Sequence, residues 1–326
     1  MSTRVEKLPC EEAFSIPEVI DAASKLAGGV PSMSTGLIGG PLLPILLDIG
    51  AGRIASMDAA GVDMHVLSLS APGVQNFDTA TARSLATLAN DRLADAIKAY
   101  PKRFTGLAAV APQDPASAAQ ELERGVKKLG LKGAIINSHT RGEYLDDKKF
   151  WPILEAAEAL DVPIYIHPRE PSPGMAVPLA IPGFTVGWGF AVETGTHSLR
   201  LIGAGVFDRF PKLTIVIGHM GEMIPFEIDR IDNRFRFETG LFNSGKLKKL
   251  PGEYFRENFY VTTSGMNFEA PLLATIRTIG VDRVLYAIDH PYEDQKKEVA
   301  AIEAMPLSRD DLRKICDTNV RRVFKI

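Results

Sequence analysis

The chain has 326 residues, of which 45% are hydrophobic and 24% charged, and its formal net charge is −3. This composition is typical of a globular protein and excludes an intrinsically disordered chain. The basic residues are scattered, without a basic stripe carrying interleaved aromatic residues, so we expect no nucleic-acid partner. We also expect no membrane association and a cytoplasmic location, because no apolar run approaches the ~20 residues of a membrane span and no secretory signal pattern opens the chain. With only two cysteines, reduced thiols are expected.

Short apolar runs alternate with amphipathic segments along the whole chain. Strands are predicted at residues 11–14, 64–70, 104–111, 133–137, 163–167, 213–218, 260–263 and 284–289. Helices are predicted at residues 52–60, 79–100, 115–130, 148–160, 192–209, 269–279 and 308–324, with a further helix after His219. Eight strand–helix repeats predict an α/β fold, a (β/α)8 TIM barrel in one domain spanning residues 1–326. Residues 31–50 and 171–187 are rich in Pro and Gly and are predicted to be long irregular insertions.

Three predicted strands run directly into a side chain that can bind a metal ion or titrate, namely His167, His219 and Asp289. Parallel α/β barrels place their chemistry at the carboxyl ends of the strands. A neutral imidazole suits a divalent transition metal. Carboxylates such as Asp289 and Glu11 are costly to bury at the ends of apolar strands unless they are paired or bind a metal. For His167 the alternative is a core histidine bonded to a carbonyl, and for Glu12 a structural salt bridge is expected.

His219 and Glu222 stand in a segment with two glycines, Gly218 and Gly221. The glycines allow a tight turn that brings the imidazole and the carboxylate together, which is a usual arrangement for general acid–base chemistry. The alternative is that Glu222 only favours the first turn of a following helix.

The remaining candidates are less specific. His65 and His197 are expected to be structural, and His139 either reaches the barrel mouth or belongs to an ordinary turn. The positions expected to bind anions or line the site are Arg169, Arg230 and His290.

Nine short motifs occur in a fixed order from about residue 9 to the C-terminus. They are Glu11–Phe14, Ala111–Pro115, Asn137–Thr140, Tyr165–Pro168, Gly189–Gly195, Gly203–Pro211, Gly218–Glu222, Thr262–Gly265 and Ile288–Tyr292. Together they resemble the aromatic-acid decarboxylases of the amidohydrolase superfamily, above all the 5-carboxyvanillate decarboxylases, with the gamma-resorcylate and 2,3-dihydroxybenzoate decarboxylases as relatives.

The resemblance implies a role for each matching position. The implied metal ligands are Glu11, His167 and Asp289, the implied catalytic pair is His219 and Glu222, and the implied substrate contacts are Arg230 and Tyr292. The implied cofactor is one divalent ion, manganese as in the nearest group or zinc as in others.

The sequence departs from the pattern of these relatives at two places. Most superfamily hydrolases carry a His-x-His motif on the first strand. In this sequence Ala13 takes the place of the second histidine, and some of the decarboxylases share this replacement. Residues 36–43 lack an arginine that the 5-carboxyvanillate enzymes carry there. The fourth strand ends in Asn137 and not in the lysine that commonly bridges two metal ions, so a single ion is expected.

We therefore expect non-oxidative decarboxylation of an ortho-hydroxylated aromatic acid. In this hypothesis the ion chelates the phenolic oxygen and one carboxylate oxygen, Asp289 carries the proton, and His219 and Glu222 shape the site. The alternatives are a metal-dependent hydrolase acting on a small aromatic or heterocyclic compound, and a barrel that only binds small aromatics.

Two further expectations concern assembly and substrate choice. The insertions at 31–50 and 171–187 supply surface that a bare barrel does not need, so a homodimer or homotetramer is expected. The missing arginine should leave an apolar wall and a preference for a less polar ring than that of 5-carboxyvanillate; the residues expected to form this wall are Leu37, Ile38, Leu42 and Leu43.

Overall fold

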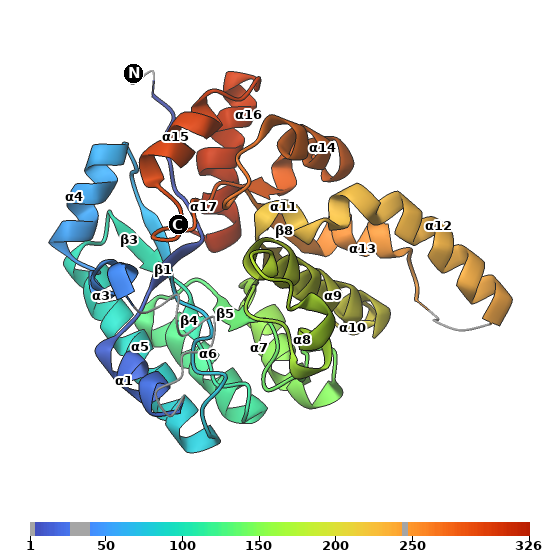
Figure 1. Ribbon diagram of the computed structural model, residues 1–326, viewed down its shortest axis with the longest axis horizontal. Helices are drawn as coiled ribbons and strands as arrows, with labels where there is room; N and C mark the ends of the chain where they lie inside the picture. The colour runs from blue at the N-terminus through green and yellow to red at the C-terminus, as the bar shows by residue number, and fades with distance from the viewer. Residues whose placement is uncertain (1–3, 27–39, 243–246) are drawn as a thin grey trace.

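The computed structural model describes residues 4–26, 40–242 and 247–326 (Figure 1), and the side chain of residue 242 is not described. Its strands are β1 (Glu12–Phe14), β2 (His65–Leu69), β3 (Phe104–Gly106), β4 (Ala108–Ala109), β5 (Ala134–Asn137), β6 (Ile164–His167), β7 (Ile215–Ile217), β8 (Phe259–Thr262) and β9 (Val284–Leu285). They form a sheet β1-β2-β3 and a sheet β4-β5-β6-β7-β8-β9. Every pairing is parallel.

Backbone hydrogen bonds join the two sheets at both edges. The strand predicted at 104–111 contains both β3 and β4: the N–H of Leu107 donates to a carbonyl of β2 at 2.9 Å, and the N–H of Ala108 donates to the carbonyl just before β5 at 2.8 Å. At the other edge the N–H of Ala13 donates to the carbonyl of His290 at 2.8 Å. The strands therefore follow one another around a ring, and their carboxyl ends meet at one rim.

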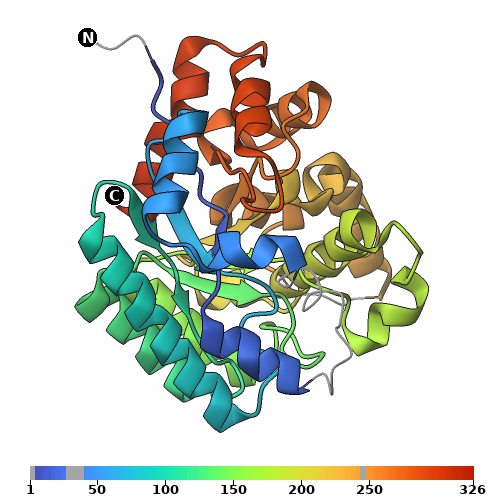
Figure 2. The same ribbon diagram turned by 60° about the vertical axis from the view of Figure 1, so that its left-hand side comes forward.

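Helices surround the sheet strands on the outside (Figures 1 and 2). The longer ones are α1 (Pro17–Leu26), α4 (Ala51–Ala60), α5 (Thr79–Ala99), α6 (Pro115–Leu129), α7 (Trp151–Leu160), α9 (Phe190–Gly203), α12 (Ile224–Phe242), α13 (Pro251–Asn258), α14 (Glu269–Ile279) and α15 (Gln295–Glu303). The shorter ones are η1 (Gly40–Leu42), α3 (Leu43–Leu47), η2 (Lys148–Phe150), α8 (Pro173–Leu179), η3 (Thr185–Gly189), α10 (Val206–Arg209), α11 (His219–Glu222), η4 (Val281–Arg283), α16 (Arg309–Arg313), η5 (Lys314–Thr318) and α17 (Asn319–Phe324).

Local sequence explains where the helices begin and end. In α6 the Asp114 side chain accepts a hydrogen bond from the N–H of Ser117 at 3.2 Å, and Pro115 occupies the first turn, where no intrahelical N–H bond is needed. Gly130 ends the helix in a left-handed conformation, with φ of 76°. The predicted bounds of this helix are confirmed.

Proline-led segments account for most of the differences from the prediction. The predicted irregular insertions contain η1, α3, α8 and η3, while residues 27–39 lie outside the described ranges. α1 and α13 were not predicted, and α1, α3, α8 and α13 all carry a proline in the first turn, where it presets the helical φ angle instead of breaking the helix. The helix α15 was also missed, although Asp294 caps it by accepting from the N–H of Lys297.

The last strand is shorter than predicted. Only Val284–Leu285 belong to the sheet, because the next backbone N–H groups find other partners: that of Tyr286 donates to the carbonyl of Ile315 at 2.9 Å, and that of Ile288 donates to the Glu12 side chain at 3.0 Å. The chain leaves the sheet there and turns toward the rim of the barrel.

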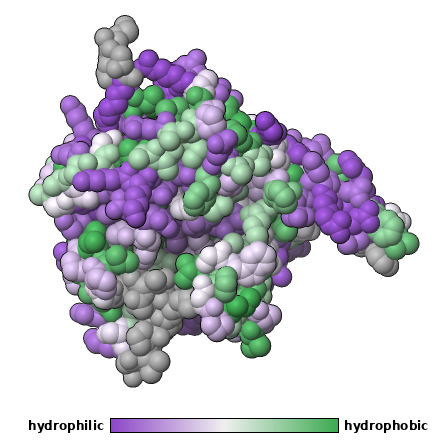
Figure 3. Space-filling model, turned by 45° about the horizontal axis from the view of Figure 1, so that its top comes forward, coloured by the Kyte–Doolittle hydropathy of each residue, from purple (hydrophilic) through white to green (hydrophobic). Residues whose placement is uncertain are grey.

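Two surface features complete the description. The helix α12 extends from the body as an arm (Figure 1), and most of its visible surface in Figure 3 is hydrophilic, with apolar side chains near its end. Across the ranges given above, none of the helices combines the length and the apolar character that a membrane span needs. Cys10 and Cys316 are both buried and free, as expected.

Candidate metal and catalytic site

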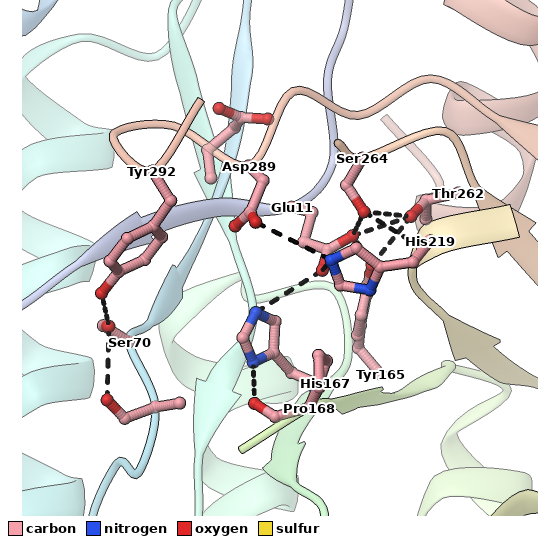
Figure 4. Close-up of polar contacts among 12 residues, drawn as sticks. Glu11, Ser70, Tyr165, His167, Pro168, His219, Thr262, Ser264, Asp289 and Tyr292 are labelled. Atoms are coloured by element: carbon pink, nitrogen blue, oxygen red, sulfur yellow. Dashed lines mark hydrogen bonds and ion pairs between the residues drawn. The ribbon is translucent and has the colours of Figure 1, made fainter. Parts of the chain in front are cut away.

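Three strand-end side chains meet at the rim of the barrel (Figure 4). Glu11 immediately precedes β1, His167 is the last residue of β6, and Asp289 follows β9. One ligand atom from each lies within 4.8 Å of those of the other two. This is the trio expected from the sequence to bind a metal ion.

The two carboxylate oxygens of Glu11 have different surroundings. Oε2 accepts hydrogen bonds from the hydroxyls of Tyr165, Thr262 and Ser264, the second at 2.7 Å. Oε1 is buried and has no hydrogen-bond partner within the described part of the chain, and it faces Nε2 of His167 at 3.5 Å. Burial alone would raise the pKa of Glu11, but the nearby histidines and the hydroxyl donors lower it. Glu11 is therefore an ionised carboxylate with one oxygen free to bind a cation.

His167 also presents a free lone pair toward the same point. Its Nδ1 lies 2.7 Å from the carbonyl oxygen of Pro168. A carbonyl only accepts, so the proton is on Nδ1 and the lone pair is on Nε2, which faces Glu11. The bond to a carbonyl that we considered as an alternative does exist, but it orients the ring for ligation instead of satisfying it.

Asp289 completes the trio from an unusual backbone conformation, with φ of 75°. Burial raises the pKa of its carboxyl to about 6, and the charge of Glu11 adds to this, while His219 and His167 act in the opposite direction. A bound cation would favour the ionised form.

His219 and Glu222 are brought together as predicted. Nδ1 of His219 lies 2.8 Å from Oε1 of Glu222, and Nε2 lies 3.8 Å from Oδ2 of Asp289. Burial alone would lower the pKa of His219, but Glu222 and Glu11 raise it well above its usual value. The glycine at 218 is required, because a Cβ there would lie 2.9 Å from Oε1 of Glu11.

The alternative for Glu222, a carboxylate placed only to favour a helix N-terminus, does not describe this contact. Glu222 lies in a left-handed turn before α12, with φ of 51°, and its side chain is directed at His219.

A cavity of about 390 Å³ opens onto these groups, a volume typical of sites for small molecules. Most of its wall is apolar. The lining residues that do not belong to the groups above are Leu42, Ala71, Pro168, Val186, Gly187, Phe190, Ala191, Gly265, Met266, Tyr292 and Glu293. Tyr292 thus lies where the sequence predicted a substrate contact, and its hydroxyl is 2.6 Å from Oγ of Ser70.

Three predicted substrate contacts do not line this cavity. Arg169 is buried and its guanidinium bonds to Asn76 at 2.8 Å and to Glu170 at 2.7 Å, so it is occupied within the protein. His290 is buried, and its ring packs against that of His65 with the centroids 5.8 Å apart. Arg230 is exposed on α12. Arg169 and His290 do not line the cavity because sequence proximity to a strand end does not determine the direction of a side chain, and their substrate contacts stay predictions.

The other histidines are buried outside the cavity, as expected for His65 and His197. His139 uses both ring nitrogens: Nδ1 accepts from the N–H of Gly142 at 3.1 Å, and Nε2 bonds to the carbonyl of Glu170 at 3.1 Å. It belongs to a turn and does not reach the mouth.

Glu12 is buried, but its partners differ from the expected salt bridge. Its carboxylate accepts hydrogen bonds from the backbone N–H groups of Ile288 at 3.0 Å and His290 at 3.1 Å. The nearest ring nitrogen, of His65, is 3.9 Å away, and burial lowers the pKa of that histidine well below its usual value. Burial raises the pKa of Glu12 to about 8, although the two N–H donors act in the opposite direction.

Sequence reasoning missed the hydroxyl groups around Glu11. Tyr165 precedes His167 by two positions, and Thr262 and Ser264 have the same spacing at the end of β8. Side chains two apart on a strand point to the same face, so this spacing was the available signal.

Comparison with known proteins places the chain in a well-defined group. The family model described as Amidohydrolase matches residues 46–326. The gamma-resorcylate decarboxylase of Polaromonas sp. (strain JS666 / ATCC BAA-500) is 39% identical over 98% of both chains. The crystal structure of the 5-carboxyvanillate decarboxylase from Sphingomonas paucimobilis has a TM-score of 0.95 with 41% identity and covers 99% of this chain and 100% of its own.

A second similar structure contains a metal ion. The 5-carboxyvanillate decarboxylase from Novosphingobium aromaticivorans, complexed with manganese and 4-hydroxy-3-methoxy-5-nitrobenzoic acid, has a TM-score of 0.94 with 40% identity and covers 99% of this chain and 96% of its own. The predicted (β/α)8 barrel and the predicted resemblance are confirmed by these similarities.

Proposed function

This chain belongs to the amidohydrolase family, and decarboxylases of that family match the chain over nearly its whole length. We propose that the protein is a metal-dependent decarboxylase of hydroxybenzoate-type acids. The reaction is non-oxidative and releases CO2. The observation that supports it best is that two free lone pairs, on Oε1 of Glu11 and on Nε2 of His167, meet beside Asp289. His167 and Asp289 in turn line a largely apolar cavity.

The three side chains fit a divalent ion of the manganese type. Two carboxylates and one imidazole are suitable donors, and the hydrogen bonds to Oε2 of Glu11 and from Nδ1 of His167 hold the donors in place. When bound, the ion supplies positive charge that orients an ortho-hydroxy acid through its oxygens and polarises it. Manganese is the ion in the similar structure from Novosphingobium aromaticivorans, and zinc remains the alternative.

The chain's own residues then handle one proton. Asp289 donates it to the ring carbon that bears the carboxylate, the bond from that carbon to the carboxylate breaks, and its electron pair restores the aromatic ring as CO2 leaves. His219, kept protonated by Glu222, lies 3.8 Å from Asp289 and is placed to return a proton to it. Asp289 is thus both a ligand and the proton carrier.

The cavity wall favours a ring with a single carboxylate. Leu42, Val186, Phe190 and Met266 form apolar wall, and among the described lining residues no arginine or lysine is present to pair with a second anionic group. Glu293 adds a carboxylate at the rim. The wall residues Leu37 and Ile38 of the original prediction lie outside the described ranges, and Leu43 is not among the lining residues.

A homodimer or larger assembly remains part of the proposal. Large apolar side chains are exposed on α12 and on the segment that contains α8 and η3, among them Phe226 at 83%, Val177 at 87% and Phe184 at 64%. Arg230 is exposed on the same helix as Phe226, so we assign its predicted contact to a substrate held by a second copy of the chain. The cytoplasmic location also stays a prediction.

The direct test is a screen for CO2 release. The purified protein, loaded with manganese, is incubated with salicylate-type acids, dihydroxybenzoates and 5-carboxyvanillate, and CO2 and the matching phenol are quantified. We expect equal amounts of both from ortho-hydroxylated acids and none from benzoate. Release of an alcohol or amine from esters or amides without CO2 would favour the hydrolase alternative.

A further inference from the structure

Two neighbouring acidic residues at the start of β1, Glu11 and Glu12, point to different partners. Glu11 is directed at His167 and Asp289, whereas Glu12 is fully buried and bonds to the loop that presents Asp289. No step proposed above uses Glu12. A buried polar group that does no chemistry is costly unless it is hydrogen-bonded, and the contacts of Glu12 therefore point to another role.

Glu12 bonds to the backbone on both sides of Asp289. Oε1 accepts from the N–H of Ile288 at 3.0 Å and Oε2 accepts from the N–H of His290 at 3.1 Å, which are the backbone groups on either side of Asp289. The next residue of β1 also bonds to this loop, because the N–H of Ala13 donates to the carbonyl of His290. The loop is thus attached to β1 by three hydrogen bonds over three residues.

Asp289 needs such attachment because its backbone is in the left-handed region, with φ of 75°. Residues other than glycine adopt this region at a cost, and they persist there only when surrounding contacts fix them. Its own carbonyl accepts from the N–H of Tyr292 at 2.8 Å, which shapes the turn but does not anchor it to the barrel. Within the described chain, Glu12 is the side chain that bonds to the backbone on both sides of Asp289.

We propose that Glu12 is a positioning residue, whose carboxylate holds the loop 288–290 so that Asp289 meets Glu11 and His167 in a geometry ready to bind the metal ion. Adjacent residues at the start of β1 then have separate tasks: Glu11 provides a ligand, and Glu12 orients Asp289, the ligand that follows β9. Because Glu12 is fully buried, water cannot replace either bond. The inference rests on the proposed metal site, but it does not depend on which acid is the substrate.

The test measures manganese binding, not turnover. Glu12→Gln keeps the size of the side chain but replaces one acceptor by an NH2 group, which must face one of the two N–H donors. We expect the Kd for Mn2+, measured from the free-ion signal by electron paramagnetic resonance, to rise about 10- to 100-fold, as when other outer partners of metal ligands are removed. A folded variant with a wild-type Kd would overturn the proposal.

Asn90→Ala is the matched control. Asn90 is also buried and also makes two hydrogen bonds to one strand, with the N–H and the carbonyl of Ala109, each at 2.8 Å, but it contacts none of the ligands. It should lower thermal stability and leave the Kd for Mn2+ within about twofold. If Asn90→Ala weakens manganese binding as much as Glu12→Gln does, the effect is general loosening and the proposal is wrong.

A measurement on the unchanged protein covers the case in which Glu12→Gln does not fold. Hydrogen exchange at the amides of Ile288 and His290 is followed with and without Mn2+. We expect both amides to be protected before the ion binds, because Glu12 holds the loop in advance. Rapid exchange in the metal-free protein, slowed only by Mn2+, would show that the ion and not Glu12 orders the loop, and would overturn the proposal.

Discussion

The ends of β5 and β6 are neighbours in the sheet, with Asn137 opposite His167, yet they have opposite characters. At the end of β5 the backbone carbonyls and the ring of His139 are occupied by the protein. Gln75 donates to the carbonyls of Asn137 at 3.0 Å and His139 at 2.9 Å, and both ring nitrogens of His139 have partners. At the end of β6, one nitrogen of His167 is held and the other is free.

The difference shows that a histidine at a strand end does not by itself mark a metal site. After β5 both ring nitrogens of His139 are used for holding a turn, so this imidazole has no free lone pair to offer a cation. Around β6 the hydrogen bonds are placed on the far side of each ligand, at Oε2 of Glu11 and Nδ1 of His167, so that the near side stays free. The predictions below test this distinction.

The largest effect is expected from removing a ligand. His167→Ala and Asp289→Ala should abolish metal retention, because each removes one of three donors, and activity should fall with it. His139→Ala, at the neighbouring strand end, should cost stability but keep one ion per chain. Elemental analysis of the purified variants measures this. A wild-type stoichiometry near two would contradict the single-ion site, and loss of metal from His139→Ala would contradict the distinction itself.

A smaller effect is expected at the free edge of the site, where His219 is held by Glu222. His219→Asn and Glu222→Gln should lower kcat by roughly 10²- to 10⁴-fold, the usual loss when a proton-transfer group is removed. Metal content should remain near one ion per chain, because neither residue belongs to the ligand trio. Full activity in both variants would exclude the pair from catalysis.

These distinctions also show what sequence can predict. The convergence of Glu11, His167 and Asp289 was predictable because apolar runs lead to His167 and Asp289, and such runs end at the carboxyl rim of the barrel even though β9 itself stops at Leu285. The arrangement of occupied and free lone pairs was not, because it depends on pairs distant in the chain: Gln75 bonds to the carbonyl of Asn137, and Tyr165 and Thr262 bond to Glu11. The direction of Arg169 was hidden for the same reason, since its partner Asn76 lies 93 positions away.

A buried histidine beside the end of β5 predicts a pH dependence of folding. It is His197, whose Nδ1 lies 3.4 Å from Oγ of Ser138, the residue that follows β5. Burial lowers the pKa of His197 to about 3, whereas in the unfolded chain it titrates near 6.5. The unfolded state therefore binds the proton first, and stability falls as pH drops from about 6.5 toward 3. Between pH 7 and pH 4.5 this histidine alone should reduce the free energy of unfolding by about 3 kcal/mol.

Denaturant titration of His197→Gln checks this value. Gln can still accept the hydrogen bond that the N–H of Leu145 donates to Nε2 of His197 at 3.1 Å, but it does not titrate. The loss of stability on acidification should be smaller than in the wild type by that amount. The control Ser198→Ala changes a buried neighbour without a titrating group and should keep the wild-type slope. An unchanged slope in His197→Gln would show that His197 is not held neutral.

The smallest effect concerns the choice of acid substrate. The cavity beside His167 and Asp289 has a largely apolar wall, and this wall should decide which ring is accepted. Since the described lining residues include no arginine or lysine, a ring with a second carboxylate finds no cationic partner, and Glu293 at the rim repels it. The kcat/KM for a salicylate-type or alkyl-substituted acid should therefore exceed that for 5-carboxyvanillate. Glu293→Gln should reduce this ratio of kcat/KM values by roughly fivefold, because two charges a few ångströms apart in water interact by about 1 kcal/mol.

Asp294→Asn is the matched control: it removes the same charge at the next residue, where the side chain caps α15 outside the cavity, and it should leave the ratio unchanged. A clear wild-type preference for 5-carboxyvanillate would show that another cation replaces the missing arginine, and Arg230 from a second copy would be the first residue to test.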